Sequence, residues 1–164
     1  DRQAQGVAAQ QEQFVARNWT DDELHCVALL VQFHELRQEV ARSAVLYSFR
    51  ETGLKALFSA MLEEGAPAPD SVLASWGDQV TKEALSSRLV MDADLPAERS
   101  ADALDGCIRK IKARQLQAQQ KSLQEGIAQA ARTGQEEELR RLQVAKMNLA
   151  RELKALGVTV KGPA

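Results

Sequence analysis

Residues 101–156 decide the fold of this chain and read ADALDGCIRKIKARQLQAQQKSLQEGIAQAARTGQEEELRRLQVAKMNLARELKAL. Arg132-Thr133-Gly134 interrupts the stretch with a tight break, and both flanking segments are rich in helix formers. In the second segment a seam of residues recurs at alternating intervals of three and four, which predicts a helix with one side against a partner helix. The seam consists of Leu139, Leu142, Lys146, Leu149, Leu153 and Leu156.

The first segment carries a matching apolar stripe, which slips by about one residue between Ile111 and Leu116, so its two halves are expected to face different neighbours. Counting equally outward from the break places Leu142 opposite Gly126 and Ile127. We therefore predict an antiparallel helical hairpin. At about 1.5 Å per residue its first helix would span about 48 Å, which is too long to be buried inside a small domain.

The composition of the whole chain predicts an all-α protein. Apolar residues make up 45% of the 164 residues, aromatic residues only 4%, and Ala, Leu, Glu, Gln and Arg dominate. From Cys107 to Leu156 there are eleven Lys and Arg against five Asp and Glu, a net charge of +6. This leaves −8 for the other residues, because the whole chain carries −2. A basic arm is thus joined to an acidic body.

Helix start and stop signals divide the rest of the chain. Thr20 precedes three acidic residues, as expected at a helix N-terminus, and the Pro67 to Pro69 segment ends a later helix. A further helix is predicted over 78–90, with Val80, Leu85, Leu89 and Val90 facing inward. The expected plan is a compact helical bundle followed by a long protruding hairpin. Its parts are a linker (1–18), the bundle (19–100), the hairpin (101–156) and a tail (157–164).

The sequence offers no convergent catalytic set. Glycine-rich phosphate loops, HExxH and paired cysteine ligands are absent from it. His25 and Cys26 are adjacent on a helix and point about 100° apart, so a half-buried helix explains them better than a metal site. We interpret Asp92-x-Asp94 as a solvated helix terminus and His34 as a cap or surface residue. We therefore expect no catalytic residue, no metal and no cofactor.

Two cysteines without metal-ligand spacing, Cys26 and Cys107, predict a reducing, cytoplasmic environment. No apolar run approaches the length of a membrane span, so we expect no membrane partner. The chain begins at Asp1 without a methionine or a signal-peptide pattern, so it is expected to be a piece of a longer protein.

A cluster of cations near the start of the hairpin is a candidate phosphate-binding patch. We favour a solvated helix face instead, because no stacking aromatic residue accompanies the cations, and we expect at most weak direct nucleic-acid binding. The cluster consists of Arg109, Lys110, Lys112 and Arg114.

The far half of the hairpin is the feature that most suggests a function. Its apolar residues can cover one another, but a layer of two helices leaves its flanks open to water, and such surfaces usually dock onto something. The same open flanks would allow weak self-association. We therefore predict that the tip of the hairpin is a binding device.

Four stretches, in this order, resemble the C-terminal helicase-binding domain of bacterial DNA primases (DnaG). The resemblance spans residues 20–156, and the terminal Asn-x-x-x-Glu-Leu and the order of the elements carry it. His34 stands where the family usually has a proline before Glu-Leu. The stretches are Asp22-Glu23-Leu24-x3-Ala28-Leu29-Leu30-Val31-x3-Glu35-Leu36, Leu104-x2-Cys107-Ile108-x2-Ile111, Ala131-Arg132-Thr133-Gly134-x3-Glu138-Leu139 and Met147-Asn148-Leu149-Ala150-Arg151-Glu152-Leu153-Lys154.

The resemblance implies a non-catalytic adaptor from a primase, an enzyme that is a DNA-directed RNA polymerase (a nucleotidyltransferase). Such a hairpin would insert among the N-terminal domains of the hexameric replicative helicase (DnaB type) and couple RNA-primer synthesis to unwinding at the replication fork. Binding would combine apolar anchors with a salt-sensitive charged rim. The residues carried over from the family to the distal hairpin are Leu123, Ile127, Arg132, Leu139, Arg141, Leu142 and Lys146.

Three other hypotheses for the function remain open. The helicase's own N-terminal domain shares the bundle-and-hairpin plan and would form rings by pairing hairpins, although a helicase would continue past Leu156 into an ATPase. A helical nucleic-acid-binding module would use Arg109 to Arg114 and bind DNA with a steep salt dependence. A small-molecule enzyme is the reading that the residues support least.

Overall fold

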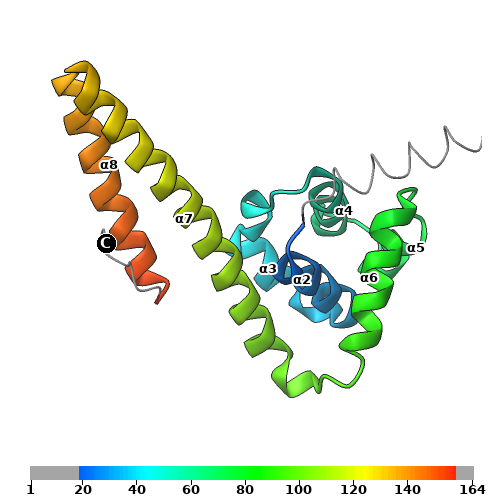
Figure 1. Ribbon diagram of the computed structural model, residues 1–164. Coiled ribbons are helices and arrows are strands. Elements are labelled where there is room, and N and C mark those ends of the chain that lie inside the picture. Colours follow the sequence, from blue (N-terminus) through cyan, green and yellow to red (C-terminus); the bar gives the residue numbers. More distant parts are fainter. Residues whose placement is uncertain (1–18, 158–164) are drawn as a thin grey trace, which may run out of the picture. The chain divides into compact units, whose positions relative to one another are not determined.

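The computed structural model describes residues 19–157, and this part of the chain consists of helices and connecting turns without a strand (Figure 1). The all-α prediction is therefore confirmed for these residues. The expected linker (1–18) and all but the first residue of the expected tail (157–164) lie outside them. The α-helices are α2 (Asp21–Gln32), α3 (Arg37–Ser43), α4 (Thr52–Leu62), α5 (Pro69–Ala74), α6 (Gln79–Met91), α7 (Ser100–Thr133) and α8 (Glu136–Ala155), and the 3-10 helices are His34–Leu36, Val45–Ser48 and Ala97–Arg99.

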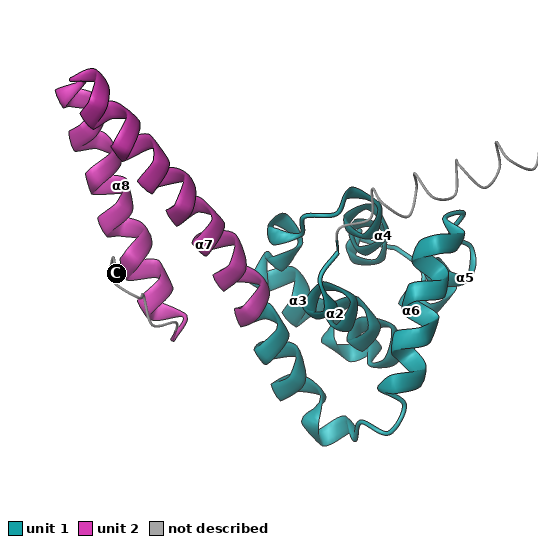
Figure 2. Ribbon diagram, viewed as in Figure 1, with its two compact units in different colours: residues 1–108 teal, residues 109–164 magenta. Residues whose placement is uncertain are grey.

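The described chain divides into two compact units, with the boundary between Ile108 and Arg109 (Figure 2). Unit 1 contains α2 to α6 and the start of α7, and unit 2 contains the rest of α7 and all of α8. The expected domain boundary, between residues 100 and 101, stays a prediction.

Helix α2 forms the centre of unit 1. The Thr20 hydroxyl accepts a hydrogen bond from the Glu23 amide (3.2 Å), so the predicted N-cap is confirmed. The side chains from Cys26 to Leu30 are fully buried, as expected for a helix that is apolar on most sides. Even Glu23 is buried, and its carboxylate accepts hydrogen bonds from the Thr20 hydroxyl (3.1 Å) and the Arg50 amide (3.4 Å).

Helix α4 carries the aromatic part of this core. Its N-cap is Glu51, whose carboxylate accepts hydrogen bonds from the amides of Gly53 (2.9 Å) and Leu54. One side of the helix buries Leu54, Leu57, Phe58 and Met61, which recur at intervals of three, one and three, as on the apolar side of an amphipathic helix. The ring of Phe58 stacks on that of Phe49, with 4.7 Å between the ring centroids.

Helix α6 differs from its prediction in which residues it buries. Leu85 is fully buried as expected, but Val90 is 77% exposed, and Val80 and Leu89 are only partly covered. Thr81 takes the remaining buried position, where its hydroxyl donates to the Asp78 carboxylate (2.9 Å). The expected inward position of Val90 is therefore wrong, because it lies in the last turn of the helix on the side away from Leu85.

Every helix in residues 19–157 is too short or too polar to cross a lipid bilayer.

Candidate partner-binding surface

The predicted break between the two long helices is confirmed at Gly134. This residue has a φ of +68°, the left-handed conformation that glycine adopts without a steric penalty. The Gln135 amide donates to the Ala130 carbonyl (3.1 Å), which is the long hydrogen bond of a Schellman C-terminus. The Gln135 carbonyl then accepts from the Leu139 amide (2.9 Å), so α8 begins immediately after the turn. Two residues, Gly134 and Gln135, thus separate the helices.

Helix α8 returns beside the second half of α7 (Figure 1). Gly126 faces Leu142 there, as predicted. A Cβ atom at Gly126 would lie 3.3 Å from Leu142 Cδ1, so the absence of a side chain lets the two helices approach closely. The predicted seam of α8 is covered throughout. Leu149 and Leu153 are buried, and Leu139, Leu142, Lys146 and Leu156 are half-buried. We refer to unit 2 of this arrangement as the α7–α8 pair.

The predicted apolar anchors serve first to hold this pair together. They are half-buried rather than exposed, and include Leu142, which packs over Gly126. Each therefore offers only part of its surface to a partner. These anchors are Leu123, Ile127, Leu139 and Leu142.

Of the three cations carried over to the distal hairpin, two are exposed and the third is not. Arg132 donates to the Gln129 side chain (3.0 Å), and Arg141 donates to Glu138 on the same helix through Nε (3.0 Å). The hydrogen bonds from Arg141 lower the pKa of the Glu138 carboxyl group. Lys146 is half-buried in the seam. Of these three cations, Arg132 and Arg141 are thus the ones that a partner could reach.

A groove of about 470 Å³ runs along one flank of the α7–α8 pair. Its apolar lining comes from Leu123, Ala145 and Leu149, and its polar lining includes Asn148 and Glu152. The groove gives Leu123 a surface that a partner side chain could cover. The expectation that a two-helix layer leaves a flank open thus agrees with the structure here.

The predictions from sequence missed two exposed apolar residues on α8. Val144 is 57% exposed and Met147 is 60% exposed, and neither belongs to the seam. The sequence does contain a signal for them. Val144 and Met147 are apolar residues on the otherwise polar side of the helix, where only a partner could bury them.

The four cations near the start of the hairpin differ in their exposure. Arg109 and Lys110 are exposed, whereas Lys112 and Arg114 are half-buried. Arg109 and Arg114 also each make a polar or electrostatic interaction. The four cations therefore do not present one uniformly exposed face, and the solvated-face interpretation stays a prediction.

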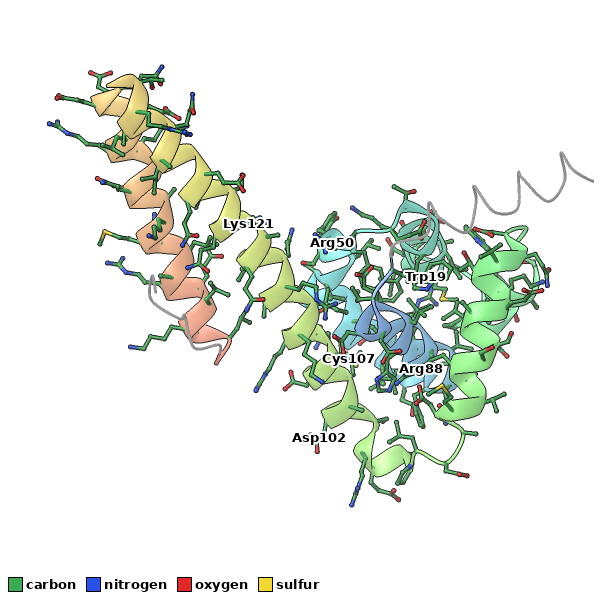
Figure 3. All side chains as sticks on the ribbon, viewed as in Figure 1. Trp19, Arg50, Arg88, Asp102, Cys107 and Lys121 are labelled. Carbon is green, nitrogen blue, oxygen red and sulfur yellow. The ribbon has the colours of Figure 1, made fainter. Side chains whose placement is uncertain are left out.

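A second cluster, in unit 1, joins three segments that are distant in sequence (Figure 3). The Cys107 Sγ lies 3.2 Å from His25 Nδ1, and His25 Nε2 lies 3.4 Å from Asp92 Oδ2. Arg88 donates to the same Asp92 oxygen through Nε (2.9 Å) and to Asp21 through Nη1 (2.8 Å). Asp92 is largely buried, so its interpretation as a solvated terminus is wrong. Asp94 is exposed.

The geometry of this cluster favours a structural role. The imidazole ring of His25 lies between the Cys107 sulfur and the Asp92 oxygen, so both cannot bind one ion together with the ring. In residues 19–157 no group of His, Cys, Asp or Glu side chains has the geometry to hold a metal. Neutral His25 can donate from Nε2 to Asp92 while its Nδ1 accepts from the Cys107 thiol. Burial raises the pKa of the neighbouring Cys26 thiol, which keeps that thiol protonated.

The cluster predicts a pH-dependent stability. Burial lowers the pKa of His25, and this outweighs the opposing effects of Asp92, Asp21 and Asp22, while Arg88 lowers it further. The unfolded state therefore binds a proton more readily, so stability should fall as the pH drops below about 6.5.

His25→Gln should reduce the loss of unfolding free energy between a pH of about 7.5 and about 5.5, as measured by urea unfolding. His34→Gln is the matched control, because His34 is the other histidine of the chain and is exposed. Equal pH dependence in wild type and His25→Gln would contradict the assignment.

Comparisons of the chain with protein-family models, with curated proteins and with solved structures found no match.

Proposed function

We propose that this chain is the helicase-binding domain of a bacterial DNA primase, a compact helical bundle followed by a protruding hairpin. It would act without catalysis, by binding the N-terminal domains of the hexameric replicative helicase and so coupling RNA-primer synthesis to fork unwinding. The four sequence stretches that resemble the primase family are the first support for this proposal.

The observation that carries the proposal is the α7–α8 pair itself. Two long helices joined at Gly134 expose a flank groove, lined by Leu123 and Leu149, and two exposed cations near the turn, Arg132 and Arg141. An apolar centre with a charged rim is the usual anatomy of a specific protein interface. A helix pair of this kind fits a partner that is itself helical.

Light-scattering sizing with a replicative helicase from the same source, at low and moderate salt, tests the proposal. We expect a complex that co-elutes and weakens as salt rises, because the rim is charged. The triple variant Leu123→Ala, Ile127→Ala, Leu142→Ala should weaken this complex by at least about tenfold, since each change truncates an apolar side chain that holds the α7–α8 pair together and offers part of its surface to a partner.

The matched control is Leu46→Ala, Tyr47→Ala, Leu62→Ala, which truncates three apolar residues bordering a groove in unit 1. Circular dichroism should show that both triple variants keep their helices. Arg132→Glu is a second test that leaves the seam intact, because Arg132 is exposed. Undiminished complex formation by the folded Leu123, Ile127 and Leu142 triple variant and by Arg132→Glu would refute the proposal.

The same experiment distinguishes the proposed function from a second candidate, the N-terminal domain of the helicase itself. Residues that can pair two helices can also pair two hairpins, as the partly covered Ile127 and Leu139 suggest. A defined oligomer of the chain alone, without any complex with added helicase, would favour that candidate. A monomer that binds helicase would exclude it.

A further inference from the structure

Helix α8 has a second stripe, separate from the buried seam. Its five residues follow one another at intervals of four, three, four and three, so at about 100° per residue they fall within an arc of about 80°. All five are exposed, on the side of α8 opposite the seam. We call this set the outer stripe, and it consists of Arg140, Val144, Met147, Arg151 and Lys154.

The outer stripe combines an apolar centre with cationic ends. Val144 and Met147 lie together in the middle, with Arg140 one turn before them and Arg151 and Lys154 after them. None of these three cations makes an ion pair or side-chain hydrogen bond within the described chain, whereas Arg141 nearby is paired with Glu138. The stripe therefore offers cations that have no ion-pair partner among the described residues, around two exposed apolar side chains.

We infer that the outer stripe binds an acidic amphipathic helix of another protein. Residues spaced by three and four match the side-chain rows of a helix, and carboxylates on the partner would pair with the cations on either side of an apolar contact. The stripe spans about 21 Å, so the partner needs about four helical turns. The inference does not depend on the identity of the parent protein.

The flank groove extends this surface. Asn148 lies on the groove edge next to Val144 on α8, and Leu123, Ala145 and Leu149 form the apolar lining beyond it. An apolar side chain from one row of the partner helix could enter the groove while the next row covers Val144 and Met147. Glu152, which also lines the groove, disfavours partner acids on that side and so helps to set the partner's rotation.

Two other occupants fit the stripe less well. The first is a membrane surface. A helix that binds a membrane needs a broad apolar face, whereas this stripe has two apolar residues, Val144 and Met147. Nucleic acid would use the cations but would leave the central apolar pair uncovered. An acidic helix accounts for both the charges and the apolar centre.

The test is a selection from a displayed library of peptides of about 20 residues, long enough to form an isolated helix. The full chain is the bait, and Val144→Ser, Met147→Ser is the counter-selection bait. We expect enriched peptides with a row of apolar residues spaced by three and four, flanked by Asp and Glu. No enrichment over the counter-selection, or enriched peptides without net negative charge, would overturn the inference.

The enriched peptide is then titrated against purified variants by fluorescence anisotropy. Val144→Ser, Met147→Ser should weaken binding by at least about tenfold at any salt concentration. Arg140→Glu, Arg151→Glu, Lys154→Glu should weaken it at least as much, with a larger effect at low salt than at high salt.

Matched controls use residues that are exposed elsewhere in the described chain. Val90→Ser, Met91→Ser removes two exposed apolar side chains of α6, and Arg42→Glu, Arg99→Glu, Lys121→Glu makes the same change in net charge. Both controls should bind the peptide like wild type. Weakening by the controls, or stripe-dependent binding of anionic phosphatidylglycerol vesicles or duplex DNA in place of the peptide, would also overturn the inference. A helicase complex that fails to form would leave the peptide result unaffected, so the two proposals can fail separately.

Discussion

Phe58→Ala should lower the unfolding free energy by about 3–5 kcal/mol. The Phe58 side chain is fully buried, and its ring stacks on Phe49 with 4.7 Å between centroids. Truncation removes most of an aromatic side chain's apolar burial and leaves a cavity that helix α4 cannot close without moving the rest of its buried side. Loss of the ring pair adds to this cost.

Urea unfolding measures this effect directly. Both tryptophans of the chain, Trp19 and Trp76, lie in unit 1, so their fluorescence reports on the unit that contains Phe58, while circular dichroism reports on all helices. Tyr47→Ala is the control, because Tyr47 is 73% exposed and its loss should change stability by no more than about 0.5 kcal/mol. A Phe58→Ala protein within about 1 kcal/mol of wild type would contradict the described core.

The helices and their ends were predictable because their signals are local. The Thr20 N-cap lies next to the residues that it caps, and the break at Gly134 depends on a backbone conformation that favours glycine. The facing positions of Gly126 and Leu142 followed from counting outward from that break. In each case the residues that determine the feature lie in one short stretch of the sequence.

The remaining features depend on contacts between distant residues. Cys107 and His25 are 82 positions apart, and Arg88 and Asp21 are 67 positions apart, so no spacing motif could indicate that either pair meets. The burial of Thr81 in place of Val90 likewise depends on which elements surround α6, and not on the apolarity of the residues themselves.

The candidate surface was predicted only in part for a related reason. The seam of α8, with its intervals of three and four, identifies the residues that hold two helices together. The contact between the helices covers these residues at least in part. Val144 and Met147 remain exposed because they lie outside the seam. A search for the second periodic stripe on the same helix would have found them. On a two-helix pair, the stronger hydrophobic pattern marks the internal contact, and the weaker one marks the surface left for a partner.

Gly126→Leu should destabilise the α7–α8 pair by about 1–3 kcal/mol. The new Cβ would lie 3.3 Å from Leu142 Cδ1, and the carbons beyond it would occupy the space of that side chain. Gly106→Leu, in the same helix, should have the opposite effect and add up to about 1 kcal/mol, because nothing lies within 4 Å of its new Cβ and leucine favours a helix over glycine.

Thermal unfolding followed by circular dichroism compares the two variants, and Gly126→Ala serves as the intermediate case. Alanine at residue 126 should be nearly neutral, because the flexible end of Leu142 can move by a few tenths of an ångström while helix propensity improves. Equal effects of leucine at residues 106 and 126 would show that α7 and α8 do not pack closely at Gly126. If Gly126→Leu destabilises the pair and also weakens the helicase complex, binding requires the packed pair and not α8 alone, because this substitution leaves every exposed residue of α8 unchanged.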